Sequence, residues 1–339
     1  VDYPFNLTGI LYFPKITNDL NMQKDKIQLY QNQVFVTDNV ESIVPEFLTL
    51  LRGVIDSPDI PLNVSRSYLQ ADGAVKKISA YITRKVADKL ASLFKKNRGD
   101  YEKKWNDIKI VIEYGMLSEE KFFEKSEKFA LYPSVDEKYY TYEELFNKIK
   151  AKQTDKDDKL VILYASDKEA QHSYIENAKA KGYEVLLLDS PIAGHLIQKL
   201  ESSKEKISFA RVDSDHIDDL IKKDDSKVSK LSDDQKTNLE NMLKDIIPSE
   251  KYTVKLESLD NKDHPFIITT PEFMRRMKEM QQSGGNSMFG NMPEIYNLII
   301  NVNNPINSEI LKSKSKDKKE RLIKQSLDLA KLSQNLLKG

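Results

Sequence analysis

Cysteine is absent from this chain of 339 residues, and glycine is scarce. Without cysteine the chain has no disulfide, no thiolate zinc site, no iron–sulfur cluster and no cysteine nucleophile. Its 11 glycines fall in neither a GxGxxG nor a GxxxxGKS/T pattern, which excludes the familiar phosphate-binding loops. Net charge is also absent, because 53 basic and 53 acidic residues cancel, so no overall basic field attracts nucleic acid or anionic lipid.

Long apolar runs are missing as well. Stretches such as residues 185–188 and 298–300 are far shorter than the roughly 20 residues of a membrane span, so we expect no transmembrane segment. The opening VDYPFNLTGILYFPKI starts with valine and has no signal-peptide pattern, which indicates a piece of a longer protein. Together with the lack of cysteine, this favours a reducing, cytoplasmic location.

The patterns that are present indicate several domains, since one domain usually has roughly 100–200 residues. After strand patterns at the start, apolar spacings predict a long helix from Val75 to Phe94, stopped by Gly99, and a second helix before Gly115. The strands LVILYA and YEVLLLD flank a helix at 168–181 and, with residues 207–212, predict a parallel βαβ sheet. The remainder predicts a helix at 235–246, strands at 252–256 and 266–269 and in IYNLIINV, and a final helix from Lys319 to Leu337. The fold class is therefore multi-domain, with α/β and α+β parts.

The segment DIPLNVSRSYLQ, residues 59–70, is a candidate anion site. If Ser65 caps a helix, Arg66 and Gln70 lie one turn apart on the same face near its start. An arginine fork beside free backbone N–H groups suits a phosphate. An ordinary solvated arginine at a helix start explains the same pattern, so these residues alone leave both interpretations open.

Methionine is concentrated near the end of the chain, where five of the eight methionines fall between residues 274 and 292. Phe273, Met277 and Met280 form a narrow apolar stripe at helical spacing, followed by QQSGGNS. Such a stripe suits a surface that accepts apolar partners of different shapes. A helix facing the core of its own domain is the alternative interpretation.

Candidate metal ligands are few. The four histidines are at least twenty residues apart, and neither HExxH nor GxSxG occurs. The aspartates Asp213, Asp215, Asp218 and Asp219 lack the glycine and the closing glutamate of an EF-hand. We therefore expect a solvated acidic loop and no metal site.

Two of these segments carry a family resemblance. The sequence DNVESIVPEFLTLLRGVIDSPDIPLNVSRSYLQ resembles the middle-domain signature of the heat-shock protein 90 family. The sequences FMRRMKEMQ and MPEIYNLIINVNNP resemble the C-terminal domain of its bacterial HtpG-type members. KFFEKSEKFALYPS and YEVLLLDSPIAGHLIQKL agree in order and spacing, so the resemblance covers nearly the whole chain and points to the Bacteroidetes type.

The resemblance implies four regions. Residues 1–90 would be the large α/β part of a middle domain truncated at its start, and 91–155 a helical connector. Residues 156–221 would be a small α/β subdomain. Residues 222–339 would be a C-terminal domain for client binding and dimerisation that lacks its last helix.

The activity implied by the resemblance is that of an ATP-driven, homodimeric chaperone for unfolded or partly folded client proteins. ATP, with Mg, would be bound by an N-terminal domain that is absent here, so this chain is not an enzyme on its own, whereas the intact protein is expected to be an ATPase. Arg66 would correspond to the arginine that contacts the γ-phosphate, and Gln70 to its neighbouring partner. A guanidinium in that place stabilises charge on the transferred phosphoryl group.

The resemblance also implies two interaction surfaces. The client-binding residues would be Phe273, Met277, Met280, Gly194, His195 and Gln198. At His195 the sequence departs from the best-known pattern, which has tryptophan. The dimerisation seam would include Leu322, Leu329 and Leu336, which are spaced by seven.

Two further hypotheses belong to other functional classes. The chain could be a nucleotide-independent scaffold that joins partner proteins through its last helix and its methionine segment. Alternatively, Asp189, at the end of a predicted strand, could accept a phosphoryl group, since ligand sites often lie at strand ends. No partner lysine or acidic cluster near Asp189 supports the second hypothesis.

Overall fold

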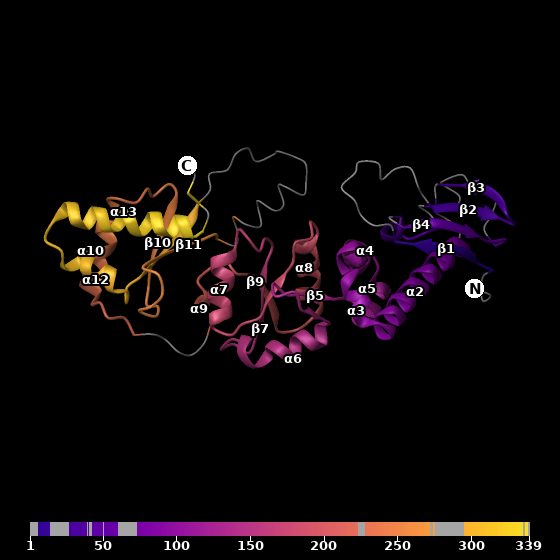
Figure 1. Ribbon diagram of the computed structural model, residues 1–339, viewed down its shortest axis with the longest axis horizontal. Helices are drawn as coiled ribbons and strands as arrows, with labels where there is room; N and C mark the ends of the chain where they lie inside the picture. Colours follow the sequence, from indigo (N-terminus) through magenta and orange to yellow (C-terminus); the bar gives the residue numbers. More distant parts are fainter. Residues whose placement is uncertain are drawn as a thin grey trace. The chain divides into compact units, whose positions relative to one another are not determined.

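The computed structural model describes residues 6–13, 27–38, 40, 43–49, 51–59, 73–222, 228–271, 274, 295–334, 336 and 337. The chain divides into two compact units, residues 1–132 with 139–143 and residues 133–138 with 144–339, and each is described by itself (Figure 1). Both units contain helices and sheets, which confirms a mixed, multi-domain fold class. Of the helices that the structure describes, none combines the length and apolar character of a membrane span.

The first unit is built on a four-stranded sheet of order β1-β4-β2-β3. Its strands are β1 (Thr8–Tyr12), β2 (Ile27–Gln31), β3 (Val34–Thr37) and β4 (Arg52–Asp56). The β2–β3 turn places Asn32 and Gln33 at φ of 48° and 68°, the conformation that matches a two-residue hairpin to the twist of its strands. Gly53, at φ 137°, lets β1 approach β4, because a Cβ there would lie 1.9 Å from the carbonyl oxygen of Ile10.

Helices form the rest of the first unit. They are η1 (Glu46–Leu48), α2 (Gly73–Lys96), α3 (Arg98–Lys103), α4 (Trp105–Ser118) and α5 (Glu120–Ser126). The long predicted helix is confirmed as α2, but Gly99 does not stop it, because Asn97 caps a new helix by accepting a 3.1 Å hydrogen bond from the Asp100 N–H. Gly115 is likewise inside α4, where a Cβ would lie 2.7 Å from Phe47 and 2.8 Å from Phe122. This glycine makes room for aromatic packing and does not end the helix.

Most of the first half of the second unit is a βαβ segment, the name used here for residues 142–222. Its parallel sheet has the order β8-β7-β9, which confirms the predicted sheet. Its elements are α6 (Tyr142–Gln153), β7 (Leu160–Ala165), α7 (His172–Ala180), β8 (Val185–Leu187), α8 (Ala193–Ser203), β9 (Ile207–Arg211) and α9 (Ile217–Leu220). All six residues of β7 are buried, as expected for a central strand covered on both faces. The short strands β5 (Tyr132–Pro133) and β6 (Tyr139–Tyr140) precede this segment and were not predicted.

Residues 228–337, called the C-terminal segment here, form a three-stranded sheet of order β10-β12-β11 packed against helices. The elements are α10 (Asp233–Lys244), β10 (Tyr252–Glu257), β11 (Phe266–Thr269), β12 (Tyr296–Asn301), α12 (Pro305–Lys312) and α13 (Lys316–Ser333). Ser232 and Gln235 form a reciprocal capping box at the start of α10. Helix α12 was not predicted, and α13 begins three residues before and ends four residues before the predicted bounds of the final helix.

Buried asparagines fix the turn that precedes β11. The side-chain amides of Asn301, Asn303, Asn304 and Asn307 donate to backbone carbonyls of the 259–265 loop at 2.6–3.1 Å. Asn304 also caps α12 by accepting a 2.9 Å bond from the N–H of Ile306, with Pro305 in the first turn. The run NVNNPIN therefore supplies amide donors that replace regular pairing in this loop.

Candidate functional site

The predicted phosphate-contacting pair and the predicted methionine stripe lie outside the described residues. This applies to Arg66, Gln70, Phe273, Met277 and Met280. Their chain neighbours are described: β4 ends at Asp56 and α2 begins at Gly73, so Arg66 lies between these two elements in the sequence. The methionine stripe lies between β11 and β12 in the sequence. The roles of these five residues stay predictions.

Gly194, His195 and Gln198 come together on the exposed face of α8. The opposite face of this helix carries Ala193, Leu196, Ile197 and Leu200, all buried. The 3.6-residue period separates the two faces cleanly, so the helix is held by its apolar side and presents small and polar groups outward. This face can contact a partner without any rearrangement of the βαβ core.

The leucines spaced by seven do not share one environment. Leu322 and Leu336 are partly buried against the core of the C-terminal segment, whereas Leu329 is 62% exposed. The inward face of α13 is formed instead by Ile323, Leu327 and Ala330. Leu336 lies beyond the end of α13 at Ser333, so the helical repeat does not determine its environment. Leu332, which the prediction omitted, is 60% exposed and extends the outward apolar surface.

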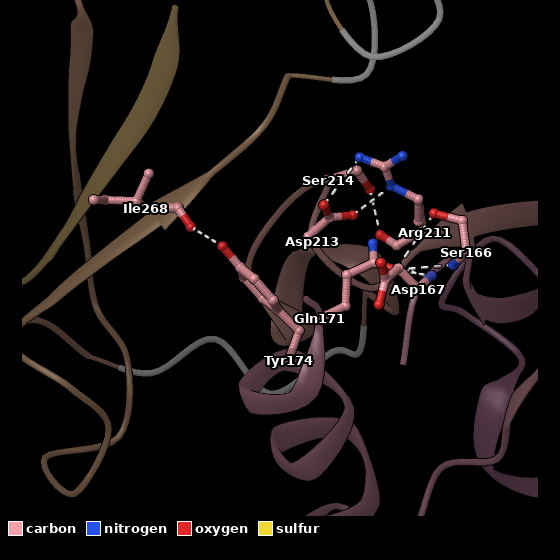
Figure 2. A network of polar contacts seen from close by, with 8 residues as sticks. All are labelled: Ser166, Asp167, Gln171, Tyr174, Arg211, Asp213, Ser214 and Ile268. Carbon is pink, nitrogen blue, oxygen red and sulfur yellow. Dashed lines mark hydrogen bonds and ion pairs between the residues drawn. The ribbon is translucent and has the colours of Figure 1, made fainter. Parts of the chain in front are cut away.

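A polar network joins the βαβ segment to the C-terminal segment (Figure 2). The hydroxyl of Tyr174 on α7 donates to the carbonyl oxygen of Ile268 on β11. Beside it, the Thr270 N–H donates a 2.9 Å bond to the carbonyl oxygen of Asp213. Burial raises the pKa of Tyr174 well above its usual value, so the hydroxyl keeps its proton and stays a donor.

Arg211 and Asp213 form the ionic part of this network (Figure 2). The guanidinium donates two hydrogen bonds to the carboxylate, Nε to Oδ1 at 2.6 Å and Nη2 to Oδ2 at 2.9 Å. Their side chains are only 14% and 12% exposed. A bidentate pair of this kind fixes orientation and charge together. In the sequence, the only indication of this ion pair was an arginine near the end of a predicted strand, two residues before an aspartate.

The expectation of a solvated acidic loop is wrong for most of its members. Asp213 is buried in the ion pair above, and Asp218 pairs with the ammonium group of Lys181. Burial also raises the pKa of Asp215. The loop is covered because β10 and β11 pack beside it, which the local sequence does not reveal.

The remaining members of this loop meet a side chain from β10. His216, Asp219 and Glu257 bring one possible ligand atom each to within 4.8 Å of one another. Burial lowers the pKa of His216, which favours its neutral form. Burial, followed by the neighbouring Asp219 carboxyl, raises the pKa of Glu257 to about 8. The sequence showed no motif because Glu257 lies far from the other two along the chain.

Comparison with known proteins finds one family that matches the sequence along nearly its whole length. The family model described as "Hsp90 protein" matches residues 1–333. A chaperone protein HtpG of Bacteroides fragilis is 52% identical over 321 residues, covering 94% of this chain and 47% of the relative. One of Porphyromonas gingivalis is 48% identical over 336 residues, covering 98% and 49%.

A third relative agrees with these two. The chaperone protein HtpG of Bacteroides thetaiotaomicron is 52% identical over 315 residues, covering 92% of this chain and 46% of the relative. The chain therefore spans about half the length of the curated relatives that it matches.

Proposed function

The chain belongs to the Hsp90 family, and on that premise we propose that it is the middle and C-terminal part of an ATP-driven chaperone of the HtpG type. The proposal rests on the match of the family model to residues 1–333. It also rests on relatives that are named as chaperones and share about half of their aligned residues with this chain. The regions 1–90, 91–155, 156–221 and 222–339 are part of the same proposal. So are a homodimeric assembly and a cytoplasmic location.

The proposed task of this part is to contact unfolded or partly folded client proteins. Two surfaces would share it: the stripe of Phe273, Met277 and Met280, and the face of α8. The exposure of Gly194, His195 and Gln198 on a well-anchored helix supports the second surface. Apolar flexible side chains and a small polar face suit clients that share no sequence, because neither demands one fixed shape.

The second proposed task is to complete an ATPase site located in a nucleotide-binding domain outside this sequence, which would also bind Mg. Arg66 would contact the γ-phosphate, with Gln70 beside it. The support for this role is the resemblance of residues 38–70 to the middle-domain signature of the family. The charge of the guanidinium would stabilise the transferred phosphoryl group.

Client binding is tested with the 339-residue chain and a reduced, carboxymethylated, fluorescently labelled α-lactalbumin as a permanently unfolded probe. We expect Met277→Asp to raise the Kd at least tenfold, which is a loss of about 1.4 kcal/mol, because a charge replaces an apolar contact. The double change His195→Ala with Gln198→Ala should raise it about threefold, or roughly 0.65 kcal/mol by the same conversion.

The matched control is His172→Ala, another exposed histidine of the βαβ segment, on α7. Its Kd should equal that of the unchanged chain. Equal affinity for the probe in all four proteins, with circular dichroism showing that each is folded, would refute both proposed client surfaces.

A further inference from the structure

The loop before α9 and the end of β10 together form a site that the chaperone function does not use. His216 caps α9, Asp219 lies within it, and Glu257 is the last residue of β10. One ligand atom from each lies within 4.8 Å of the other two. The three side chains therefore converge from the two segments of the second unit onto one small space.

Two oxygen atoms in this space are buried without a donor. Among the described residues, no N–H or O–H group donates to Oδ2 of Asp219 or Oε2 of Glu257, and the two carboxyl groups lie close enough to share one proton. A buried carboxylate oxygen without a donor is costly, so such atoms call for a positive charge or a proton. These orphaned oxygens are observed independently of the convergence of the three residues.

The charges around the site also favour the binding of a positive charge. Asp215, on the same loop, contributes further negative charge, and Asp263 lies near enough to affect His216. Lys255 on β10 opposes them in part, while Lys181 is paired with Asp218. The balance around the two carboxyl groups is negative, which attracts a cation.

His216 determines which cation fits. Its side chain is buried, with 5% of the residue exposed, and its Nδ1 accepts a 3.3 Å hydrogen bond from the Asp218 N–H. That bond is at the long end of the normal range, so a metal ion can compete for the imidazole lone pair. Imidazole with carboxylates suits zinc and similar transition metals, whereas calcium and magnesium prefer oxygen ligands alone.

We propose that His216, Asp219 and Glu257 bind one divalent transition-metal ion of the zinc type. Three protein ligands leave a further coordination position for water, as in other three-ligand zinc sites. The bound ion neutralises the two orphaned oxygens and connects α9 directly to β10. The site thus joins the βαβ segment to the C-terminal segment by coordination as well as by the Tyr174 network.

The test is calorimetric titration of ZnCl₂ into the metal-stripped 339-residue chain at pH 7, with Glu257→Gln and Asp219→Asn as site variants. Both changes keep the size of the side chain and remove the ligand charge. His172→Asn is the control for adventitious binding by an exposed histidine. We expect one Zn²⁺ per chain in the unchanged protein and in the control, and at least 30-fold weaker binding in each site variant.

A second readout separates the site from surface binding. Zn²⁺ should raise the Tm of the unchanged chain and of the control but not that of the site variants, since only binding to the folded state stabilises it. A tenfold excess of Mg²⁺ should not displace Zn²⁺. Should circular dichroism show one site variant to be unfolded, the other decides the result.

Three results would overturn the proposal. One is the absence of Zn²⁺ binding by the unchanged chain, and another is equal affinity in a folded site variant. The third is Glu257→Gln raising the Tm in metal-free buffer while Zn²⁺ has no effect, which would mean that Asp219 and Glu257 share a proton instead of an ion. None of these results depends on client binding, so the proposed chaperone function stands or falls separately.

Discussion

Tyr174 joins the two segments of the second unit through one hydroxyl group. The ring lies against the core of the βαβ segment, and the hydroxyl donates to the carbonyl oxygen of Ile268, a residue that is 0% exposed. Removing the hydroxyl leaves that carbonyl without this donor in a place that water does not reach. The loss of this hydrogen bond therefore destabilises the position of β11, which belongs to the C-terminal segment.

We expect Tyr174→Phe to weaken this junction by about 1–2 kcal/mol, because a buried acceptor loses its donor. Hydrogen–deuterium exchange should then be roughly 5- to 30-fold faster in peptides that cover β11, where opening of the junction limits exchange. Tyr183→Phe is the matched control, since Tyr183 packs against the same βαβ core. Identical exchange in β11 for both variants would contradict the role given to the hydroxyl.

Single residues were the level at which the sequence was least informative. The solvated loop expected at residues 213–219 is in fact the place where Asp213 forms a buried ion pair. Arg211, two residues before it, was visible in the sequence. The Thr270 N–H that holds the Asp213 carbonyl comes from the C-terminal segment, and no local pattern carries such a contact. Burial of charge is decided by tertiary packing, which a short window of sequence does not contain.

Among the elements, α13 combines an inner and an outer apolar surface. The inner surface of Ile323, Leu327 and Ala330 binds the helix to its own domain. The outer surface, with Leu329 and Leu332 at 62% and 60% exposed, has no such partner within the described core of the C-terminal segment. Because the proposed chaperone is a dimer, these two leucines are the candidates for contact with a second copy.

In the full-length protein, we expect the double change Leu329→Asp with Leu332→Asp to raise the dimer Kd at least tenfold. Each buried leucine contributes roughly 1.5–3 kcal/mol, and a charge in its place must lose its hydration. Sedimentation equilibrium measures the change. Lys316→Glu, in the exposed first turn of the same helix, changes the charge far from these leucines and should leave the Kd unchanged.

Elements with strong periodicity were predictable from sequence, and elements set by capping were not. The apolar runs of β7 and β12 and the period of α2 led directly to their structures. Helix α12 was missed because its start depends on one hydrogen bond, which the Ile306 N–H donates to the side-chain oxygen of Asn304. The boundary at Asn97 was missed for the same reason, since a neighbouring glycine was the more familiar stop signal.

At the scale of the whole molecule, the chain supplies only part of the proposed ATPase. In the full-length protein, Arg66→Ala should lower kcat for ATP hydrolysis at least about 100-fold, because charge on the transferred phosphoryl group loses its stabilisation. KM for ATP should change little, since nucleotide binding is assigned to another domain. Steady-state phosphate release measures both constants.

Arg84→Ala is the matched control for that experiment. Arg84 lies exposed on α2, with its guanidinium 5.1 Å from the ring centre of Tyr81, and has no assigned part in the ATPase. Its kcat should equal that of the unchanged protein. If Arg66→Ala also hydrolyses ATP at the unchanged rate, the assignment of residue 66 is wrong.

Composition and length indicated a multi-domain chain, and the division into two compact units agrees with that. The family resemblance predicted more about the domains than composition did, because long motifs contain the order and spacing of residues as well as their types. Neither source indicated the meeting of His216 with Glu257, which requires a loop and a strand far apart along the chain to fold against each other.

The pairing of β11 with β12 has a mechanical consequence. Thr269 lies opposite Asn297, so the last residue of β11 pairs with the second residue of β12. Tyr174 binds the same strand one residue away, at the carbonyl oxygen of Ile268. A displacement of this end of β11 would therefore disturb its pairing with β12 and its bond to α7 at the same time.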